Sequence, residues 1–349
     1  MRALHTIALG LASLAVPAVA CTTFCVRGPD GLYFGRNYDY GFGDGMILVN
    51  NRGVEKASLI DRNPARWVSR HGSVTFNQFG KDSPMGGINE RGLVVEVMEL
   101  QETKYPAPDS RAAVGALEWI QYQLDNFASV EEAIPGARRI RVGTAAPIHF
   151  LMADRAGEVA TVEFLGGRMV VHRGSTLPDR VLANSPYEDS LDYAQRNAPE
   201  AGPLPRGIPG SFERFARAAR QVKAWESSPA GSAVERSFEI LDDVAQPGHT
   251  QWQIVYDLKN ATIHYRTTAN RERRAISVAA FDYACAASGR MLDIDTGRGD
   301  MTAQFMPYAA EANERQMLVA FAKSPHYSTP AAVVKNEAAR VDARRCVSA

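Results

Sequence analysis

The sequence predicts an α+β fold in which antiparallel sheets and helices form separate layers. Strand-like runs come first along the chain, followed by helices, then strands, helices and strands again. Short turns rich in glycine connect several of the strand-like runs, and such short connections require antiparallel pairing. A parallel fold would instead need a helix between successive strands, and this order does not fit the sequence.

Strand-like segments form three groups along the chain. The first group begins with a hairpin around the turn Gly-Pro-Asp-Gly, and its members are residues 22–26, 32–35, 46–49, 73–79 and 93–98. The second group comprises residues 148–153, 159–164, 169–172 and 180–183. The third group is a hairpin made of residues 252–258 and 261–266.

Helical spacing of apolar residues marks the segments between these groups. In chain order, we expect helices over residues 114–127, from Ser129 to just before Pro135, from a cap at Ser211 onward, and over residues 234–244 and 309–322. Proline-rich residues 198–210 predict a loop. Residues 331–345 predict either a surface helix or a loose tail, and the tail would cover about residues 329–349.

Composition and length exclude several classes of protein. The chain has 349 residues with 39 basic and 39 acidic side chains, so bulk charge does not favour nucleic-acid binding. The seven histidines are scattered, and neither a His-Glu-x-x-His nor a Gly-x-Ser-x-Gly motif occurs. We therefore expect no metal and no cofactor, and a single domain over residues 21–349.

The first 20 residues have the pattern of a cleaved secretory signal. A basic start is followed by a short apolar run, with alanine at positions −3 and −1 of a site after Ala20. No later apolar run is long enough to span a membrane. We therefore expect a periplasmic or secreted protein whose first residue is Cys21.

A cysteine with a free α-amino group can combine two catalytic functions. Its thiol is a nucleophile, and its amine, with an ordinary pKa near 8, can accept the thiol proton. Arg36 would favour the thiolate, and Asp39 could hold the amine by accepting its hydrogen bonds. In isolation, the same two residues also fit a surface ion pair.

Two other interpretations of this terminus remain open. Cys21 could be inert or part of a disulfide in an ordinary exported protein. It could also be lipidated, which would block the amine, although lipidation sites usually have leucine where this chain has Ala18. Of the other cysteines, Cys285 and Cys346 are expected to form a disulfide, and Cys25 to be buried and inert.

Five segments in the correct order resemble the choloylglycine hydrolase and penicillin V acylase family of N-terminal nucleophile hydrolases. The segments are Cys-Thr at residue 21 with Gly-Arg-Asn-Tyr-Asp-Tyr at 35–40, Asn-Glu-Arg-Gly-Leu at 89–93, Ala-Asn-Ser-Pro at 183–186, Pro-Gly-Ser at 209–211 followed by Glu-Arg-Phe-Ala-Arg-Ala at 213–218, and Thr-Gln-Trp at 250–252. The resemblance implies a four-layer αββα sandwich, with Cys21 at the end of its first strand. It also implies a homo-oligomer, a tetramer in the family.

The resemblance assigns roles to individual residues. Cys21 matches the nucleophile, and Arg36 and Asp39 match the charged pair beside the amine. Asn184 matches the amide that binds the oxyanion, and Arg214 matches a late active-site arginine. Without the resemblance, Asn184 also fits an Asx turn and Arg214 an exposed helix position.

Glu99 stands where bile salt hydrolases have asparagine and penicillin acylases an aromatic residue. The family uses the backbone N–H of this residue in its oxyanion hole, so the chemistry tolerates the change. We expect the Glu99 side chain at the rim of the substrate cleft, where it would disfavour anionic leaving groups. The stretch from Asn184 to Arg214 is also short compared with bile salt hydrolases.

The sequence therefore predicts an exported amidohydrolase that cleaves a linear, non-peptide amide of a small N-acyl substrate through a thioester on Cys21. Penicillin V, N-acyl amines and N-acyl homoserine lactones are the expected substrate types, with conjugated bile salts as an alternative. The competing interpretation is a non-catalytic exported or lipid-anchored binding protein that retains the fold.

Overall fold

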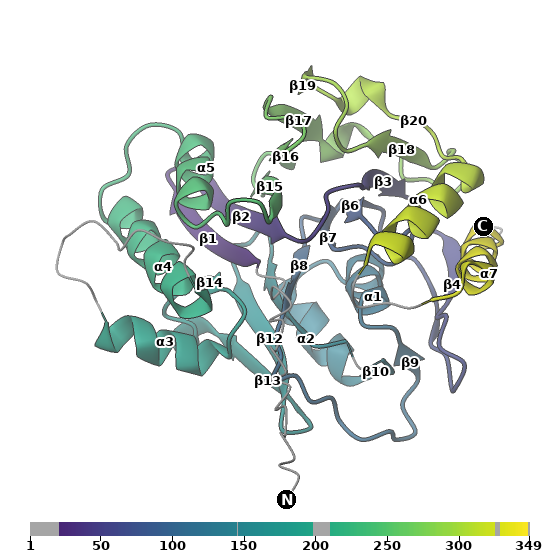
Figure 1. Cartoon of the computed structure of the whole chain (residues 1–349), viewed down its shortest axis with the longest axis horizontal. Helices are drawn as coiled ribbons and strands as arrows, with labels where there is room; N and C mark the ends of the chain where they lie inside the picture. Colours follow the sequence, from purple (N-terminus) through teal and green to yellow (C-terminus); the bar gives the residue numbers. More distant parts are fainter. Residues whose placement is uncertain (1–20, 145, 198–209, 325–328, 348–349) are drawn as a thin grey trace, which may run out of the picture.

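Two large β-sheets face each other at the centre of the molecule, with helices on their outer faces (Figure 1). The computed structural model describes residues 21–144, 146–197, 210–324 and 329–347. Almost all strand pairs in the two sheets are antiparallel, the pair β17–β19 being parallel. The predicted α+β sandwich with segregated helices is confirmed.

The first large sheet has the strand order β14-β1-β2-β15-β16-β17-β19. Its strands are β1 (Thr22–Gly28), β2 (Gly31–Asp39), β14 (Val181–Leu182), β15 (Thr250–Asp257), β16 (Thr262–Thr267), β17 (Arg274–Ser277) and β19 (Gly299–Asp300). The hairpin of β1 and β2 pairs Thr23 with Arg36, and β15 then pairs with the other edge of β2. The beginning and the last third of the chain are thus neighbours in one sheet.

The second large sheet has the order β13-β12-β11-β8-β7-β6-β3-β18-β20. Its strands are β3 (Met46–Asn50), β6 (Ser73–Asn77), β7 (Gly86–Asn89), β8 (Val94–Glu99), β11 (Ile148–Ala153), β12 (Val159–Leu165), β13 (Arg168–Arg173), β18 (Arg290–Asp293) and β20 (Met306–Pro307). Two small sheets lie beside it, made of β9 (Ala113–Val114) with β10 (Arg141–Val142), and of β21 (Arg345–Cys346), β4 (Val54–Ala57) and β5 (Arg66–Val68).

The helices cover the two sheets from outside and complete the four layers (Figure 1). Helices α4 and α5 pack on β1, β2 and β15, α3 packs on α4, and α1 packs on β7 and β8. The helices are α1 (Glu118–Asn126), α2 (Val130–Arg138), α3 (Tyr187–Arg196), α4 (Ser211–Ser227), α5 (Ala233–Asp243), α6 (Ala310–Lys323) and α7 (Ala331–Asp342). None of the helices in the described ranges combines the length and apolarity needed to cross a membrane.

Three predicted helix boundaries are wrong. The helix expected from residue 114 begins only at Glu118, because Val114 belongs to the short strand β9. Helix α2 continues through Pro135 and Gly136 to Arg138. Proline removes one intrahelical hydrogen bond, but the buried apolar face of the helix keeps the helix intact. A Cβ on Gly136 would lie 2.0 Å from the Phe127 ring, so the missing side chain lets this ring pack on the helix.

Helix α4 begins at Ser211, but Gly210 is its N-cap residue. The Ser211 hydroxyl accepts a hydrogen bond from the backbone N–H of Asn184 at 2.9 Å instead of capping its own helix. Helix α3, directly after Pro186, was not expected from the sequence. The predicted loop at 198–210 lies almost wholly outside the described residues.

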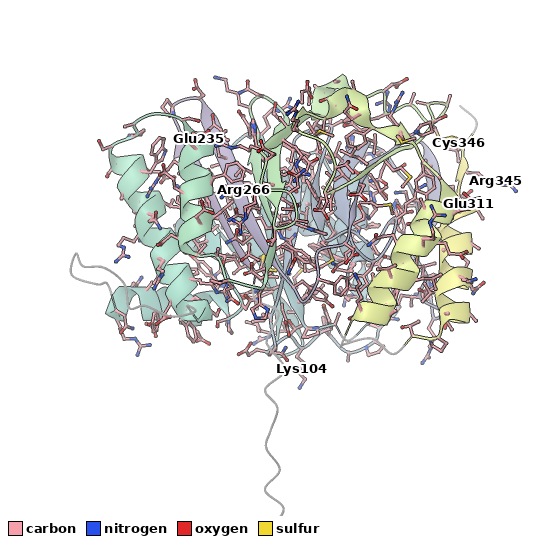
Figure 2. The ribbon with its side chains drawn as sticks, turned by 45° about the horizontal axis from the view of Figure 1, so that its top comes forward. Lys104, Glu235, Arg266, Glu311, Arg345 and Cys346 are labelled. Carbon is pink, nitrogen blue, oxygen red and sulfur yellow. A yellow bond between two sulfur atoms is a disulfide. The ribbon has the colours of Figure 1, made fainter. Side chains whose placement is uncertain are left out.

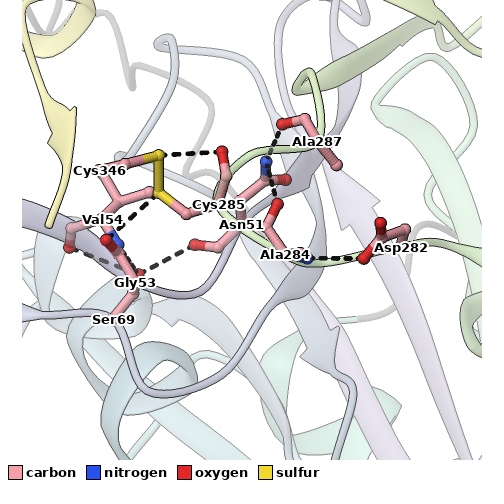
Figure 3. The surroundings of a disulfide bond; sticks show 9 residues. All are labelled: Asn51, Gly53, Val54, Ser69, Asp282, Ala284, Cys285, Ala287 and Cys346. Carbon is pink, nitrogen blue, oxygen red and sulfur yellow. Dashed lines mark hydrogen bonds between the residues drawn. A yellow bond between two sulfur atoms is a disulfide. The ribbon is translucent and has the colours of Figure 1, made fainter. Parts of the chain in front are cut away.

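The C-terminal segment is folded over its described part. Of the two alternatives expected for residues 331–345, the helix is present and the loose tail is wrong, and a short strand follows the helix. Helix α7 packs against α6, and β21 pairs with β4. The predicted disulfide between Cys285 and Cys346 is present, with the Cα atoms 5.6 Å apart. Figure 3 shows it beside Gly53, whose carbonyl lies 3.2 Å from the Cys285 sulfur. Figure 2 places Cys346 and Arg345 on the same side of the molecule as Glu311 of α6.

Candidate active site

Cys21 lies directly before β1 and lines a cavity of about 670 Å³. The residue is only 2% exposed. Apolar side chains make up most of the cavity wall, and they come from loops, from strands of both large sheets, and from α6 and α7. Such a cavity suits a small molecule with a large apolar part and a reacting group near the Cys21 sulfur.

Arg36 crosses from the first sheet to the second and brings its guanidinium to Cys21. Its Nη2 lies 3.9 Å from the Cys21 sulfur and donates to the carbonyl of Val97 at 3.0 Å. Its Nη1 donates to the carbonyl of Met85 at 2.5 Å and forms an ion pair with Glu96. Arg36 is fully buried, so these partners must offset the cost of burying its charge.

Glu96 is a site residue that the sequence interpretation missed. It is fully buried on β8, where its carboxylate pairs with Arg36 and accepts a hydrogen bond from the Tyr256 hydroxyl. A Cβ at Gly86 would lie 1.9 Å from this carboxylate, so the missing side chain provides its space. The available signal was a lone glutamate within the apolar strand Val-Val-Glu-Val-Met, because a buried carboxylate needs a partner.

Asp39 is the last residue of β2 and is also fully buried. Its Oδ1 accepts a hydrogen bond from the Thr250 hydroxyl at 2.5 Å, beside an irregularity in the pairing of β2 with β15. Its Oδ2 is buried and has no hydrogen-bond partner among the described residues. Burial raises the pKa of Asp39 to about 7, although Arg214, the Thr250 hydrogen bond and Arg36 act in the opposite direction.

Arg214 reaches from α4 to the start of β1. Its Nη1 donates to the Cys21 carbonyl and to the Thr22 hydroxyl, both at 2.6 Å. Its Nη2 donates to Asn184 Oδ1 at 2.9 Å. Arg217, one turn further along, instead donates to the carbonyl of Asp243 at 3.4 Å. Arg214 is therefore the arginine of this helix that contacts the Cys21 residue.

Asn184 follows β14 and is held from three sides. Its backbone N–H donates to Ser211 on α4, its side-chain oxygen accepts from Arg214, and its Nδ2 donates to the carbonyl of Glu99 at 2.8 Å. These contacts place the side-chain amide next to the Glu99 backbone at the end of β8. An amide held in a fixed position at the end of a strand is suited to donate a hydrogen bond to an oxyanion.

The Glu99 side chain lines the same cavity as Cys21. Gln101 donates a hydrogen bond to its carboxylate. The structure thus brings together all six residues predicted for the site. Cys21, Arg36, Asp39, Asn184 and Arg214 form one connected group, and Glu99 adjoins it through its carbonyl.

The thiol of Cys21 is not activated by its surroundings alone. Burial raises its pKa above the ordinary value of 9.0, and this effect outweighs the nearby Arg36 guanidinium, while the Asp39 carboxylate raises the pKa further. The thiol therefore needs a base to become a nucleophile at neutral pH.

Other candidate residues lie outside this group. Cys25 is buried in β1 and forms no disulfide, as predicted. His149 is buried between Glu163 and the carbonyl of Ala183, at 3.0 and 2.8 Å. Within the described ranges, no group of histidine, cysteine and acidic side chains has the geometry to hold a metal ion.

Comparisons with known proteins agree with this fold. Residues 21–199 match the family model of linear amide C–N hydrolases, choloylglycine hydrolase family. A penicillin V acylase of Pectobacterium atrosepticum is 27% identical over 287 residues, which cover 75% of this chain and 74% of the relative.

Two solved structures have the same fold. The penicillin V acylase of Agrobacterium tumefaciens has a TM-score of 0.72 at 26% identity, covering 83% of this chain and 98% of that protein. A variant of the conjugated bile acid hydrolase of Clostridium perfringens has a TM-score of 0.66 at 18% identity, covering 80% and 98%. The chain belongs to the choloylglycine hydrolase family and is a linear amide C–N hydrolase.

Proposed function

We propose that this protein is an exported acylase that cleaves an N-acyl amide through a thioester on Cys21, after residues 1–20 have been removed. One observation carries the proposal: Cys21 lines an apolar cavity beside Asp39, whose Oδ2 has no partner among the described residues. A buried carboxylate oxygen next to a new chain terminus is suited to accept hydrogen bonds from an α-ammonium group.

The α-amino group of Cys21 is the base in the proposed mechanism. It takes the thiol proton while the sulfur bonds to the amide carbonyl carbon. The resulting tetrahedral intermediate breaks its C–N bond, and the leaving amine receives the proton from the α-ammonium group. A thioester remains. Water then attacks the thioester, its proton passes through the same amine, and the acid is released with the thiol restored.

The oxyanion of this intermediate is assigned to the side-chain amide of Asn184 and the backbone N–H of Glu99. Hydrogen bonds from Asn184 to the Glu99 carbonyl and from Arg214 to Asn184 fix the amide before substrate binds. Loss of one oxyanion donor typically lowers the rate by on the order of 10²–10³. Arg36 favours the thiolate, and Arg214 positions residue 21 and Asn184.

The cavity lining supports a substrate with a large apolar acyl group. Tyr38, Phe79, Met98 and Ile148 are among the side chains that would contact it. Glu99 supports an amine component without negative charge, because two carboxylates in one cleft repel each other. N-acyl amines and N-acyl homoserine lactones fit this description best. Penicillin V, named in two relatives, and glycine-conjugated bile salts carry a carboxylate on the amine component.

The first test is the chemical state and activity of protein exported to the periplasm. N-terminal sequencing and intact mass are expected to show an unmodified Cys21 as the first residue. A panel of N-acyl homoserine lactones, neutral N-acyl amines, penicillin V and glycocholate is expected to show hydrolysis, fastest for the neutral amines. Glu99→Asn should raise the rate on glycocholate relative to the neutral substrates.

Different results would favour different functions. A lipid on Cys21, an uncut N-terminus or no hydrolysis of any amide would support the non-catalytic binding protein. Hydrolysis restricted to glycocholate would support the bile salt alternative. Equal effects of Glu99→Asn on charged and neutral substrates would contradict the role given to Glu99.

Asp39 predicts a specific pH dependence of folding stability when the Cys21 nitrogen remains in a peptide bond. Its pKa is about 7 in the fold against 3.8 as the reference, so the folded protein retains a proton that the unfolded chain loses between these values. Stability should therefore fall as pH rises from about 4 to about 7, by up to about 1.4 kcal/mol per pH unit.

Asp39→Asn should remove this contribution to the pH dependence of folding stability. Urea denaturation at several pH values measures the free energy of unfolding and so tests the prediction. In protein with a free Cys21 amine, the adjacent positive charge should lower the pKa of Asp39 and reduce the slope. Equal slopes for the blocked and the free terminus would show that the amine does not contact Asp39.

A further inference from the structure

Part of the cavity wall comes from the C-terminal hairpin, which we define as α6, α7 and β21. Met317 and Phe321 of α6 and Val341 of α7 line the cavity that also contains Cys21. The Phe321 ring packs edge-on against Phe79, another lining residue, with centroids 5.5 Å apart. The contacts of Cys21 itself come from β2 and α4, so the hairpin forms the wall without belonging to the reacting group.

Helix α6 is fixed to the loops that frame the cavity. Gln316 donates to the carbonyls of Asp44 and Gln78 at 3.0 and 3.2 Å, after β2 and after β6. A Cβ on Gly80 would lie 2.5 Å from the Met317 side chain, and Gly80 has a φ of +99°, so glycine allows this close approach. The wall formed by Met317 therefore rests directly on a turn of the second sheet.

Helix α7 is fixed through the residues that follow it. Arg344 pairs with Asp82 and donates to the carbonyl of Ala57 at 2.9 Å, and Lys56 pairs with the same Asp82 at 2.7 Å. These three charged side chains are buried. The Cys285–Cys346 disulfide and the pairing of β21 with β4 hold the end of the chain at the same place (Figure 3).

We infer that the C-terminal hairpin is the specificity-determining wall that limits the length of the acyl group, with Val341 as a lining residue at that limit. The inference rests on the proposed function, because it assigns the apolar cavity to the acyl part of the amide. Each methylene buried in an apolar cavity adds about fourfold to affinity, a gain that ends when the chain reaches a rigid wall. The tethers of α6 and α7 make this wall rigid.

Binding tests the limit independently of catalysis. Cys21→Ala protein, purified after export, is titrated by calorimetry with N-acyl homoserine lactones of 4 to about 14 acyl carbons, chosen as probes. Affinity should rise with acyl chain length up to a limit and should not increase for longer chains. In the Cys21→Ala background, Val341→Phe should lower affinity for chains at that limit by about tenfold or more and change the shortest ligand less than about twofold. Val341→Ala should move the limit to longer chains.

A matched control lies on the same helix. Val333 is 43% exposed on α7, and Val333→Phe introduces the same side chain outside the cavity. Val333→Phe should leave the affinities for all ligands of the length series unchanged. Thermal unfolding shows which variants are folded, and Val341→Ala provides the test if the larger side chain prevents folding.

The inference is overturned if Val341→Ala and Val341→Phe leave the length limit unchanged, or if both variants lower the affinity for ligands of every chain length equally. It is also overturned if the Cys21→Ala protein binds none of the probes. Failure of the proposed function has a different signature, because the enzyme with Cys21 would then hydrolyse no amide even where the length limit is observed.

Discussion

Cys21→Ala is expected to reduce amide hydrolysis to the uncatalysed background, a loss on the order of 10⁴-fold or more. The substitution removes the sulfur that forms the thioester and leaves the α-amino group in place. Cys25→Ala is the matched control, because Cys25 is also a buried free cysteine and lies four residues further along the chain, within β1. That variant should keep its activity within about twofold if it folds.

The thioester provides a direct measurement for the same prediction. Acid quenching during turnover of a slow substrate should give wild-type protein with a mass increase equal to the acyl group, and Cys21→Ala protein without one. Each variant requires N-terminal sequencing, because the substitution changes the residue directly after the proposed cleavage site. Correctly cleaved Cys21→Ala protein that still turns over would exclude the thioester mechanism.

The parts of the site that are close in sequence could be predicted from the sequence itself. Cys21, Arg36 and Asp39 lie on one hairpin, whose turn signal sets the pairing of Thr23 with Arg36. A hairpin is a local structure, so its turn and its alternating pattern determine which residues meet. The structure places Cys21 beside both charged residues, which the sequence analysis had chosen for their residue types.

Asn184 and Arg214 could be assigned only through the family resemblance. Arg214 reaches Cys21 because α4 packs on β1, and Asn184 follows β14, which pairs with β1, and accepts a hydrogen bond from Arg214. Such contacts depend on tertiary packing between segments about 160 to 190 residues apart, which periodicity does not encode. Tertiary packing also explains why the predicted cap at Ser211 is wrong. The Ser211 hydroxyl accepts a hydrogen bond from the Asn184 backbone N–H instead of capping its own helix.

Glu96 was missed because its partner belongs to the other sheet. Arg36 and Glu96 are 60 residues apart and meet only after the two sheets stack. A single glutamate in an apolar strand indicates a buried partner, but the sequence offers many arginines as candidates. The identity of a buried ion pair therefore follows from the packing of the layers, and its importance can be tested by mutation.

Glu96→Gln is expected to destabilise the folded protein by about 3–5 kcal/mol, because it leaves the Arg36 cation buried without its counter-charge. The carbonyls of Met85 and Val97 still accept hydrogen bonds from Arg36, but they carry no net charge. Tyr256→Phe is the matched control. It removes one hydrogen bond to the same carboxylate and keeps the ion pair, so it should cost about 1–3 kcal/mol.

The same substitution should change the reactivity of Cys21, whose sulfur lies 3.9 Å from Arg36 Nη2. With Glu96 neutralised, the field of Arg36 at the sulfur is no longer offset, so the pKa of the thiol should fall. Iodoacetamide labelling against pH should shift to lower pH in folded Glu96→Gln protein, whereas Tyr256→Phe should leave the labelling curve close to that of wild type. Denaturation in urea measures the stability. The prediction would be contradicted if Glu96→Gln lowered the free energy of unfolding by less than about 1 kcal/mol and left the labelling curve unshifted. Burial of Arg36 would then not require Glu96, and the ion pair would not influence the pKa of the Cys21 thiol.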